Sequence, residues 1–502
     1  MPRHGVFTRR TLFGGAALLA LAATPVSADT LQDALTNAYV NNPTLEAARA
    51  NQRANDENVQ IERAQGLPSV TASGTYTEVM RQNNTNFFNP DRILVAGVDL
   101  GIPVYSGGAV RNGIKAAQER VQAGQADLRA TESAIFAQTV AAYMDVLRGQ
   151  ALVSLSANQV EVLKVNVQAT GDRFEIGDLT RTDVAQSQSR LAVAESDLRN
   201  AEALLIRARE DYIALTGSAP AALQPPPPLP GLPASADAAV DVALENNPDI
   251  IAARDRAKAA GYDIEVAGSS RLPTVSLFAG YDYQNALGSI PDAPADPTVP
   301  GSLPTPVDQT ATGAQAGVSL RVPIFQGGRP AALQRQAQSR AQAALEQVIA
   351  TERDVIAQTR AAYSSWQASL AIIESSQVAV DAAALSLEGV RAENSIGNRT
   401  ILDVLNAEQE LLAARVQLVT ARRNAYVSGF SLLAAMGRAE ARDLGLGDES
   451  VLYDPLDNYE RVRGDIFDWG RDPAPAAVTT RTVEIPAQDA GIPPIAEQGD
   501  TP

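Results

Sequence analysis

The sequence predicts a mainly α-helical chain that also carries a small set of β-strands suited to a membrane β-barrel. Three observations lead to this fold class. Most of the 502 residues belong to an internal duplication. Each copy contains two segments in which apolar and polar residues alternate. Each copy also contains helical patterns several times longer than an average helix of about 12 residues. Each repeat therefore has the order helix, strand, strand, helix, helix.

Residues 1–28 are predicted to be a secretory signal peptide that is not part of the fold. Arginines precede a short apolar run from Leu12 to Ala23, and small residues lead to a cleavage site at Ala28. The apolar run is too short for a membrane span. We therefore expect the mature chain to act outside the cytoplasm.

The composition argues against several classes of function. The sequence contains no Cys, and its only His, His4, lies in the predicted signal peptide. We therefore predict no catalytic residue, no metal site, no cofactor, and no lipid anchor on a Cys at the mature N-terminus. Without the signal peptide, 38 basic and 58 acidic residues leave a net charge of −20, which disfavours nucleic acid as a partner.

The duplication is visible as motifs that recur at nearly constant offsets. It defines a first repeat at residues 29–217 and a second repeat at residues 236–437. Early motifs recur after 205 residues, for example Asn41-Asn42-Pro43 as Asn246-Asn247-Pro248. Later motifs recur after 220 residues, for example Ala141-Ala142-Tyr143 as Ala361-Ala362-Tyr363. Because the register is kept on both sides of the 15 additional residues, we expect those residues to lie in a surface loop.

Each repeat is predicted to open with one helix. Thr30 can cap the first, in which apolar residues recur at helical spacing as far as about Gly66. The corresponding helix of the second repeat is expected to run from about Ala236 to about Ser270.

Two predicted strands follow the first helix of each repeat. They cover residues 68–79 and 94–105 in the first repeat, and 273–284 and 314–325 in the second. Alternation with a period of two residues gives each strand one apolar and one polar face. Their lengths are close to the roughly 9–11 residues with which a tilted strand crosses a membrane. The alternation alone fits a half-buried sheet of a soluble protein equally well.

Proline and glycine mark the loops and corners between these elements. A Pro-rich stretch, residues 285–313, is predicted to be the lengthened surface loop. At the end of the second strand of each repeat, a proline followed by a glycine pair predicts a sharp corner from strand to helix. These corner residues are Pro103, Gly107, Gly108, Pro323, Gly327 and Gly328.

The longest predicted elements are helices that form two hairpins. They cover residues 110–171 and 179–217 in the first repeat, and 330–395 and 400–437 in the second. Rows of apolar residues recur every seven positions, which predicts left-handed coiled-coil packing. The rows are Val146, Val153, Val160 and Val167, and Trp366, Ile373, Val380 and Leu387.

The remaining segments connect or follow the repeats. Residues 218–235 are a Pro-rich linker, residues 438–472 a C-terminal segment, and residues 473–502 a Pro/Ala-rich tail that we expect to be disordered.

Four strands per chain impose oligomerisation if the chain spans a membrane. No run of about 18 consecutive apolar residues follows Ala28, so no transmembrane helix is expected and only a β-barrel could cross the bilayer. Four strands cannot close a barrel. Two copies would supply eight strands and three would supply twelve, and these observations do not choose between them.

The signal peptide, the duplication, the strand pairs and the heptad helices together resemble the TolC family of outer-membrane export channels, over about residues 30–440. The resemblance implies a homotrimer in outer-membrane lipid, in which a twelve-stranded barrel continues into a periplasmic tunnel of twelve helices. Residues 438–472 would contribute to an equatorial belt. A periplasmic adaptor and an inner-membrane pump of the ABC or RND type would be its partners, and it would not be an enzyme.

The resemblance also implies a gate where the helical hairpins end in the periplasm. The segment from Gly397 to Leu405 is similar to the entrance of the family's channels. Carried over to this sequence, Arg399 should reach Asp183 and Thr182 of the first repeat, and Asp403 should line the constriction.

Two positions depart from the family pattern at this entrance. Asn394 stands where the family has a latch Tyr, and Asn406 stands where a second ring of acidic residues is expected. We therefore expect a closed state that is held more weakly, and weaker binding of cations at the entrance.

Two other interpretations compete with the channel. A periplasmic coiled-coil adaptor also has a signal peptide and long helices, but it would carry one hairpin rather than two tandem copies. An enzyme that uses only carboxylates lacks a plausible cluster of residues. The sequence does not decide whether the cargo is protein or small toxic molecules, although the absence of a lipidation Cys favours protein secretion.

Overall fold

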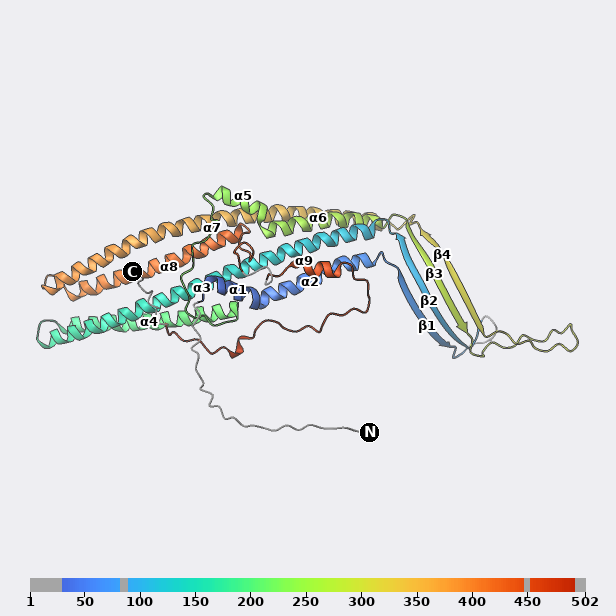
Figure 1. Cartoon of the computed structure of the whole chain (residues 1–502), viewed down its shortest axis with the longest axis horizontal. Coiled ribbons are helices and arrows are strands. Elements are labelled where there is room, and N and C mark those ends of the chain that lie inside the picture. Colours follow the sequence, from blue (N-terminus) through green and yellow to red (C-terminus); the bar gives the residue numbers. More distant parts are fainter. Residues whose placement is uncertain (1–28, 82–88, 447–451, 493–502) are drawn as a thin grey trace, which may run out of the picture.

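The computed structural model describes residues 29–81, 89–446 and 452–492, so the predicted signal peptide lies outside the described residues. The first repeat contains α1 (Leu31–Asn41), α2 (Pro43–Ala64), β1 (Ser69–Glu78), β2 (Arg92–Tyr105), α3 (Ala109–Glu175) and α4 (Arg181–Thr216). The second contains α5 (Ala236–Asn246), α6 (Pro248–Ser269), β3 (Thr274–Asn285), β4 (Thr310–Arg321), α7 (Arg329–Ser395) and α8 (Ile401–Ala435). A short helix, α9 (Pro455–Val462), follows. The molecule is elongated, with the helices at one end and the strands at the other (Figure 1).

The prediction of a single opening helix in each repeat was wrong, because Asn-Pro divides it into two helices. The side-chain oxygen of Asn42 accepts hydrogen bonds from the backbone of Thr44 and Leu45, which caps α2 at the proline. Asn42 Nδ2 also donates to the carbonyl of Leu215, at the end of α4, over 3.1 Å. In the second repeat Asn247 caps α6 and donates to the carbonyl of Ala435 in the same way. The recurring Asn-Asn-Pro motif therefore joins three helix ends in each repeat.

The four strands form one antiparallel sheet in the order β1-β2-β3-β4. Pairing of β2 with β3 joins the two repeats directly. The register aligns the predicted apolar faces across all four strands: Val70, Leu100, Ala279 and Ala316 form one row, and Ala72, Val98, Tyr281 and Ala314 form the next. Polar rows such as Thr71, Asp99, Gly280 and Gln315 occupy the other face.

The fourth strand is displaced from its predicted position. It begins at Thr310 and ends at Arg321, four residues before the predicted end. The apolar alternation continues to Phe325, but Pro323 lacks an amide hydrogen and cannot donate to a neighbouring strand. In β2 the corresponding Pro103 stays within the strand, and the pairing with β3 shifts register between Pro103 and Tyr105.

The long helices pack as two hairpins, α3 with α4 and α7 with α8. In the first, the predicted heptad row contributes buried Val146, Val153 and Val160, next to the fully buried rings of Tyr143 and Tyr212. In α7 the predicted row is only partly buried, except for Leu387. A parallel row of small residues, Ser369, Ser376 and Ala383, is buried instead.

Helix α7 departs from one expectation drawn from the sequence. It is long enough, and over part of its length apolar enough, to cross a membrane, although no such helix was predicted. That assignment depends on length and composition alone, and α7 lies along α6 and α8 in the helical body. Its exposed apolar side chains lie at an outer edge of the single chain. An assembly of several copies would cover them.

The C-terminal part of the chain wraps around the middle of the helical body. Ala439, Ala441 and Leu446 enter the main core beside α1 and α3. The prediction that the tail from residue 473 is disordered was wrong for residues 473–492, and residues 493–502 lie outside the described residues. Arg209 of α4 is almost fully buried and donates to the carbonyls of Asp489 and Gly491, both over 2.6 Å. A buried guanidinium requires acceptors, and the tail supplies them.

Glu132 makes the docking of the C-terminal segment sensitive to pH. Its carboxylate accepts a hydrogen bond from the backbone of Ala441, and burial raises its pKa to about 7. The raised pKa means that the folded state favours the protonated acid. This contribution to stability is present at low pH and is lost as the pH rises through about 7.

We predict that Glu132→Gln removes this pH dependence. The melting temperature of the detergent-solubilised wild type should fall, relative to that of Glu132→Gln, between about pH 5 and about pH 8.5. The amide of the variant can still accept from Ala441 but cannot ionise. Parallel melting curves for the two proteins over this range would contradict the assignment.

Candidate functional site at the helical hairpin ends

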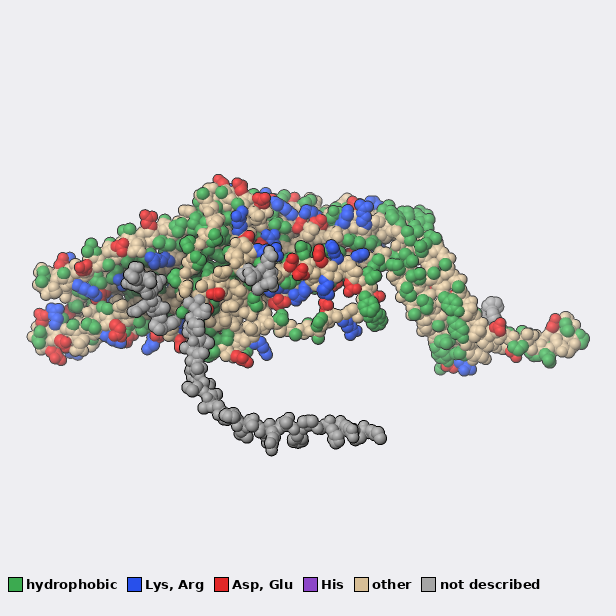
Figure 2. All heavy atoms as spheres, in the orientation of Figure 1, with side chains coloured by type: hydrophobic (Ala, Val, Ile, Leu, Met, Phe, Trp, Pro, Cys, Tyr) green, Lys and Arg blue, Asp and Glu red, His purple; other side chains and the backbone are tan. Residues whose placement is uncertain are grey.

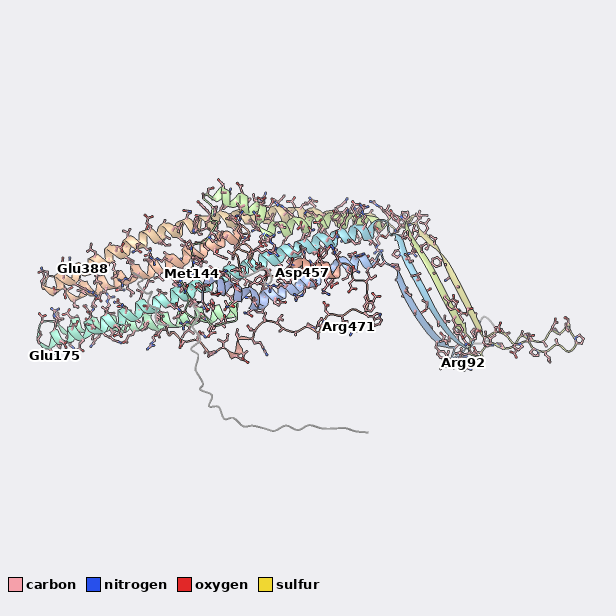
Figure 3. All side chains as sticks on the ribbon, viewed as in Figure 1. Arg92, Met144, Glu175, Glu388, Asp457 and Arg471 are labelled. Atoms are coloured by element: carbon pink, nitrogen blue, oxygen red, sulfur yellow. The ribbon has the colours of Figure 1, made fainter. Side chains whose placement is uncertain are left out.

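The two helical hairpins end in turns of the same construction. Gly177 and Gly397 adopt φ of +84° and +81° and reverse the chain after α3 and α7. In each turn the glycine amide donates to the third residue before it, and the next amide donates to the fifth residue before it. Helices end in this way when a glycine takes the left-handed conformation. Glu175 and Glu388 are labelled near these ends in Figure 3.

Both predicted gate acids cap the helix that follows the turn. Thr400 donates through its hydroxyl to Asp403 Oδ2 over 2.7 Å, and the backbone amide of Asp403 donates back to Thr400 Oγ1 over 3.3 Å. Thr180 and Asp183 repeat the arrangement in the first hairpin. The hydrogen bonds from the threonine lower the pKa of both carboxyl groups, so both are ionised at neutral pH. Thr182 is exposed and takes no part in the capping box.

Within the single chain, the predicted contact of Arg399 with Asp183 and Thr182 is not formed. Arg399 instead donates to Glu393 Oε2 over 2.7 Å, within its own hairpin. Asn394 donates to the carbonyl of Arg399 over 2.8 Å and supports the same turn. The capping box already occupies Asp183, and Glu393 is the nearer carboxylate in the sequence.

A polar link between the repeats lies a short distance inside the tips. Arg190 of α4 donates to Asn406 Oδ1 of α8 over 3.0 Å, and it also donates to Gln409 Oε1. Asn406 was expected only as a missing acid. In the structure, the amide oxygen at this position accepts a hydrogen bond from the other hairpin.

Glu408 joins three helices and was missed by the sequence analysis. Its side chain is 3% exposed. It accepts from Asn166 of α3 over 3.1 and 3.2 Å and from Arg391 of α7 over 2.9 Å. A buried carboxylate is retained only when it is paired and hydrogen-bonded. Its position three residues before Leu411, in the apolar stripe of α8, was the available signal.

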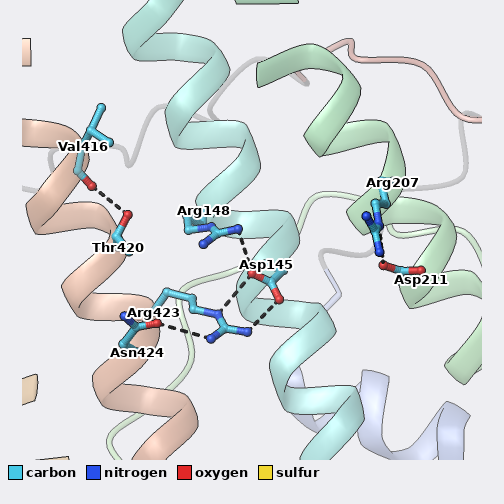
Figure 4. A network of polar contacts seen from close by, with 8 residues as sticks. All are labelled: Asp145, Arg148, Arg207, Asp211, Val416, Thr420, Arg423 and Asn424. Carbon is cyan, nitrogen blue, oxygen red and sulfur yellow. Dashed lines mark hydrogen bonds and ion pairs between the residues drawn. The ribbon is translucent and has the colours of Figure 1, made fainter. Parts of the chain in front are cut away.

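A third link lies nearer the middle of the helices (Figure 4). Arg423 of α8 donates through two nitrogens to the two carboxylate oxygens of Asp145 on α3, over 3.1 and 2.8 Å. Arg148 contacts the same carboxylate from one turn away, at 3.3 Å. Bidentate arginine–carboxylate pairs fix geometry as well as charge. Three successive polar links therefore connect the two repeats along the hairpins.

The corner residues lie where strands pass into helices. Gly107, Gly108, Gly327 and Gly328 all have positive φ, and Gly108 and Gly328 stand directly before α3 and α7. A side chain at Gly107 would collide with Leu272 and Ser269, so the corner of the first repeat packs closely against the junction between α6 and β3 in the second. Pro103 and Pro323 lie at the adjoining strand ends.

A comparison with protein families now identifies the architecture. The family described as "Outer membrane efflux protein" matches residues 34–218 and 239–438, one match for each repeat. The chain belongs to this family. It is therefore an outer-membrane protein that extends into the periplasm, in a family of TolC-like transport channels. This assignment excludes the adaptor interpretation.

Individual relatives support the same assignment. The chain is 32% identical to "Outer membrane efflux protein BepC" of Brucella suis over 469 residues, covering 93% of this chain and 98% of the relative. It is 27% identical to "Outer membrane protein TolC" of Escherichia coli, covering 83% and 84%. Among solved structures, VceC of Vibrio cholerae superimposes with a TM-score of 0.67 at 23% identity, covering 81% of this chain and 96% of that chain.

We predict that Thr180→Ala loosens the end of the first hairpin. Loss of the cap should cost about 1 kcal/mol, which corresponds to roughly fivefold faster amide hydrogen exchange in the first turn of α4. Hydrogen–deuterium exchange with mass spectrometry would measure this. Thr182→Ala is the matched control, since Thr182 has the same side chain two residues away and makes no capping bond. Equal exchange in the two variants would contradict the role of the cap.

Proposed function

We propose that three copies of this chain form the outer-membrane exit duct of a tripartite export system, with a gated entrance in the periplasm. One observation carries the proposal: a four-stranded sheet, apolar on one face and polar on the other, turns through tight corners into two long helical hairpins. The apolar face suits lipid and the polar face suits an aqueous lumen. The helices then continue that lumen into the periplasm.

The free edges of the chain support an assembly of several copies. β1 and β4 each pair on one side only among the described strands, and backbone groups left unpaired in lipid are not tolerated. The helices show the same incompleteness, since contacts run from α2 through α3 and α6 to α7. A neighbouring copy would cover the exposed apolar residues on α7, which include Leu370, Val378 and Leu385. Three copies give twelve strands, which is enough for a lumen, whereas eight strands fill their own interior.

The proposed cargo and partners are inferred from other members of the family. Relatives include "Alkaline protease secretion protein AprF" of Pseudomonas aeruginosa and "Cobalt-zinc-cadmium resistance protein CzcC" of Cupriavidus metallidurans. We accordingly propose a passive duct for proteins or small toxic molecules. A periplasmic adaptor and an inner-membrane pump of the ABC or RND type would deliver this cargo.

The gate is proposed to depend on the polar links between the repeats. Opening the entrance requires the two hairpins of a chain to separate, which breaks the contacts of Arg190 with Asn406 and of Glu408 with Asn166. Asp403, which is half-buried and ionised near the tip, is proposed to line the constriction. Asn394 supports its own turn rather than latching another hairpin, and this favours a closed state that is held by Arg190 and Glu408 instead.

We predict that Arg190→Ala and Glu408→Ala each raise the single-channel conductance of the purified protein in a planar bilayer. Each variant removes a bond between the hairpins, and a hydrogen bond to a charged group contributes about 1.5–3 kcal/mol. Arg207→Ala is the matched control on α4, because its partner Asp211 lies on the same helix. Conductance of all three variants equal to that of the wild type would contradict the gate.

Loss of the gene tests the exit duct itself. A deletion strain should retain a secreted protein in the cells or become more sensitive to toxic small molecules, and the wild-type gene should restore the phenotype. The first result would identify protein secretion, and the second small-molecule efflux. A strain unchanged in both assays would contradict the proposed function.

A further inference from the structure

The segment after α9 presents an apolar tip that the export function does not explain. Ile466, Phe467 and Trp469 are 70%, 69% and 80% exposed, within four residues of one another. Three large apolar side chains grouped on a surface mark a site of interaction. The export duct described above assigns them no role.

This tip is held by a defined loop. Arg461 and Asp472 form an ion pair at 3.2 Å that closes the base of the segment. Inside the loop, the amide of Asp465 donates to the carbonyl of Val462 over 3.0 Å, and that of Phe467 donates to Asp465 Oδ1 over 2.9 Å. These bonds fix the backbone so that the apolar side chains project outward.

The loop is also fastened to the helical body beside the sheet. Arg63 of α2 donates to the carbonyl of Arg463 over 2.8 Å, and Gln60 donates to the carbonyl of Asp465. Both donors lie in the last turns of α2, just before the chain enters β1. The loop therefore stands at the level where helices give way to strands.

A groove of about 1110 Å³ joins the tip to the apolar face of the sheet. Its lining includes Ile466 and Phe467 of the loop and Leu67 and Val70 beside the sheet, together with charged side chains at Glu57, Arg461, Asp465, Asp468, Arg471 and Asp472. Val70 begins the first complete apolar row across the four strands. Figure 2 shows hydrophobic side chains below the end of the helical body, beside the sheet, and Figure 3 labels Arg471 in the same segment. The apolar face of the sheet thus continues onto the loop.

We propose that residues 463–472 form an interfacial anchor that inserts Ile466, Phe467 and Trp469 into the inner leaflet of the outer membrane. The occupant of the groove is phospholipid at the boundary between headgroup and acyl chain, where Trp and other aromatic side chains are favoured. A second copy would extend the sheet in its own plane from the β1 edge. The Val70 side chain points out of that plane, toward lipid. This inference rests on the insertion of the sheet into the bilayer that the proposed function requires.

Tryptophan fluorescence tests the anchor, because the chain contains only Trp366 and Trp469. The full-length Trp366→Phe variant is reconstituted into vesicles of phosphatidylethanolamine and phosphatidylglycerol, with or without phospholipid brominated near the headgroup end of its chains. Emission from Trp469 should fall roughly twofold with the brominated lipid, as expected for an indole at the interface. Trp469→Phe is the matched control: its remaining Trp366 packs against Tyr363 in the helical body and should not be quenched.

A third variant separates failure of the anchor from failure of the proposed function. Tyr281→Trp, with both natural tryptophans replaced by Phe, places an indole on the apolar face of β3. If this probe is quenched and Trp469 is not, the anchor is overturned. Quenching of Trp469 by iodide would then show a tip left in water, and resistance to both quenchers would show a tip covered by a second copy. If neither probe is quenched by lipid, the sheet is outside the bilayer and both proposals fail.

Discussion

A bilayer offers no hydrogen-bond partner to a peptide group, and among the described strands the outer edges of β1 and β4 pair with no neighbour. Inside the chain the problem is solved by pairing β2 with β3, which joins the two repeats into one sheet. At the margins a single chain cannot solve it. The free edges therefore require several copies of the chain around a symmetry axis. Each feature that occurs twice in one chain then recurs in every copy around that axis.

The two repeats are joined differently at the helical end of the molecule than in the sheet. In the sheet the repeats meet through backbone bonds, which do not depend on side chains. Along the hairpins they meet through side chains: polar ones at Asp145, Asn166, Arg190 and the residues opposite them, and an apolar cluster in which Leu405 packs against Val160 and Leu163. A few polar bonds can be broken and remade without loss of the fold, whereas a strand ladder cannot. The proposed gate would thus combine a permanent junction in the membrane with a separable one in the periplasm.

Much of this fold could be predicted because its signals are local. Alternation at Val70 and Ala72, the glycine pairs after Pro103 and Pro323, and the heptads of α3 each depend on neighbours in sequence. The division of the opening helices is also a local signal, because Asn-Asn-Pro marks a helix start, yet one continuous helix was predicted across it.

The burial of Glu408 and the docking of the tail were not predicted, because both depend on contacts between residues that are distant in sequence. Glu408 is buried by helices that belong to both repeats, and the tail docks where the buried Arg209 donates to the carbonyls of Asp489 and Gly491. Arg399 was assigned to Asp183 by resemblance, and within the single chain it binds Glu393, six residues away. A residue type transferred from a family carries no information on which partner is closest in a given chain. The capping boxes are the opposite case, because the spacing of Thr400 and Asp403 in the sequence is enough to predict the hydrogen bond between them.

The joints made by Asn42 and Asn247 have a mechanical consequence. Each amide ties the start of a short helix to the last carbonyls of α4 or α8, where Gly217 and Gly437 stop those helices. Only α3 and α7 run past this level without interruption. In each chain, the helical columns that contain α4 and α8 are thus interrupted at this level, whereas those formed by α3 and α7 are continuous. If the hairpin ends open as proposed, these joints can absorb the twist of α4 and α8, and the sheet in the membrane need not deform.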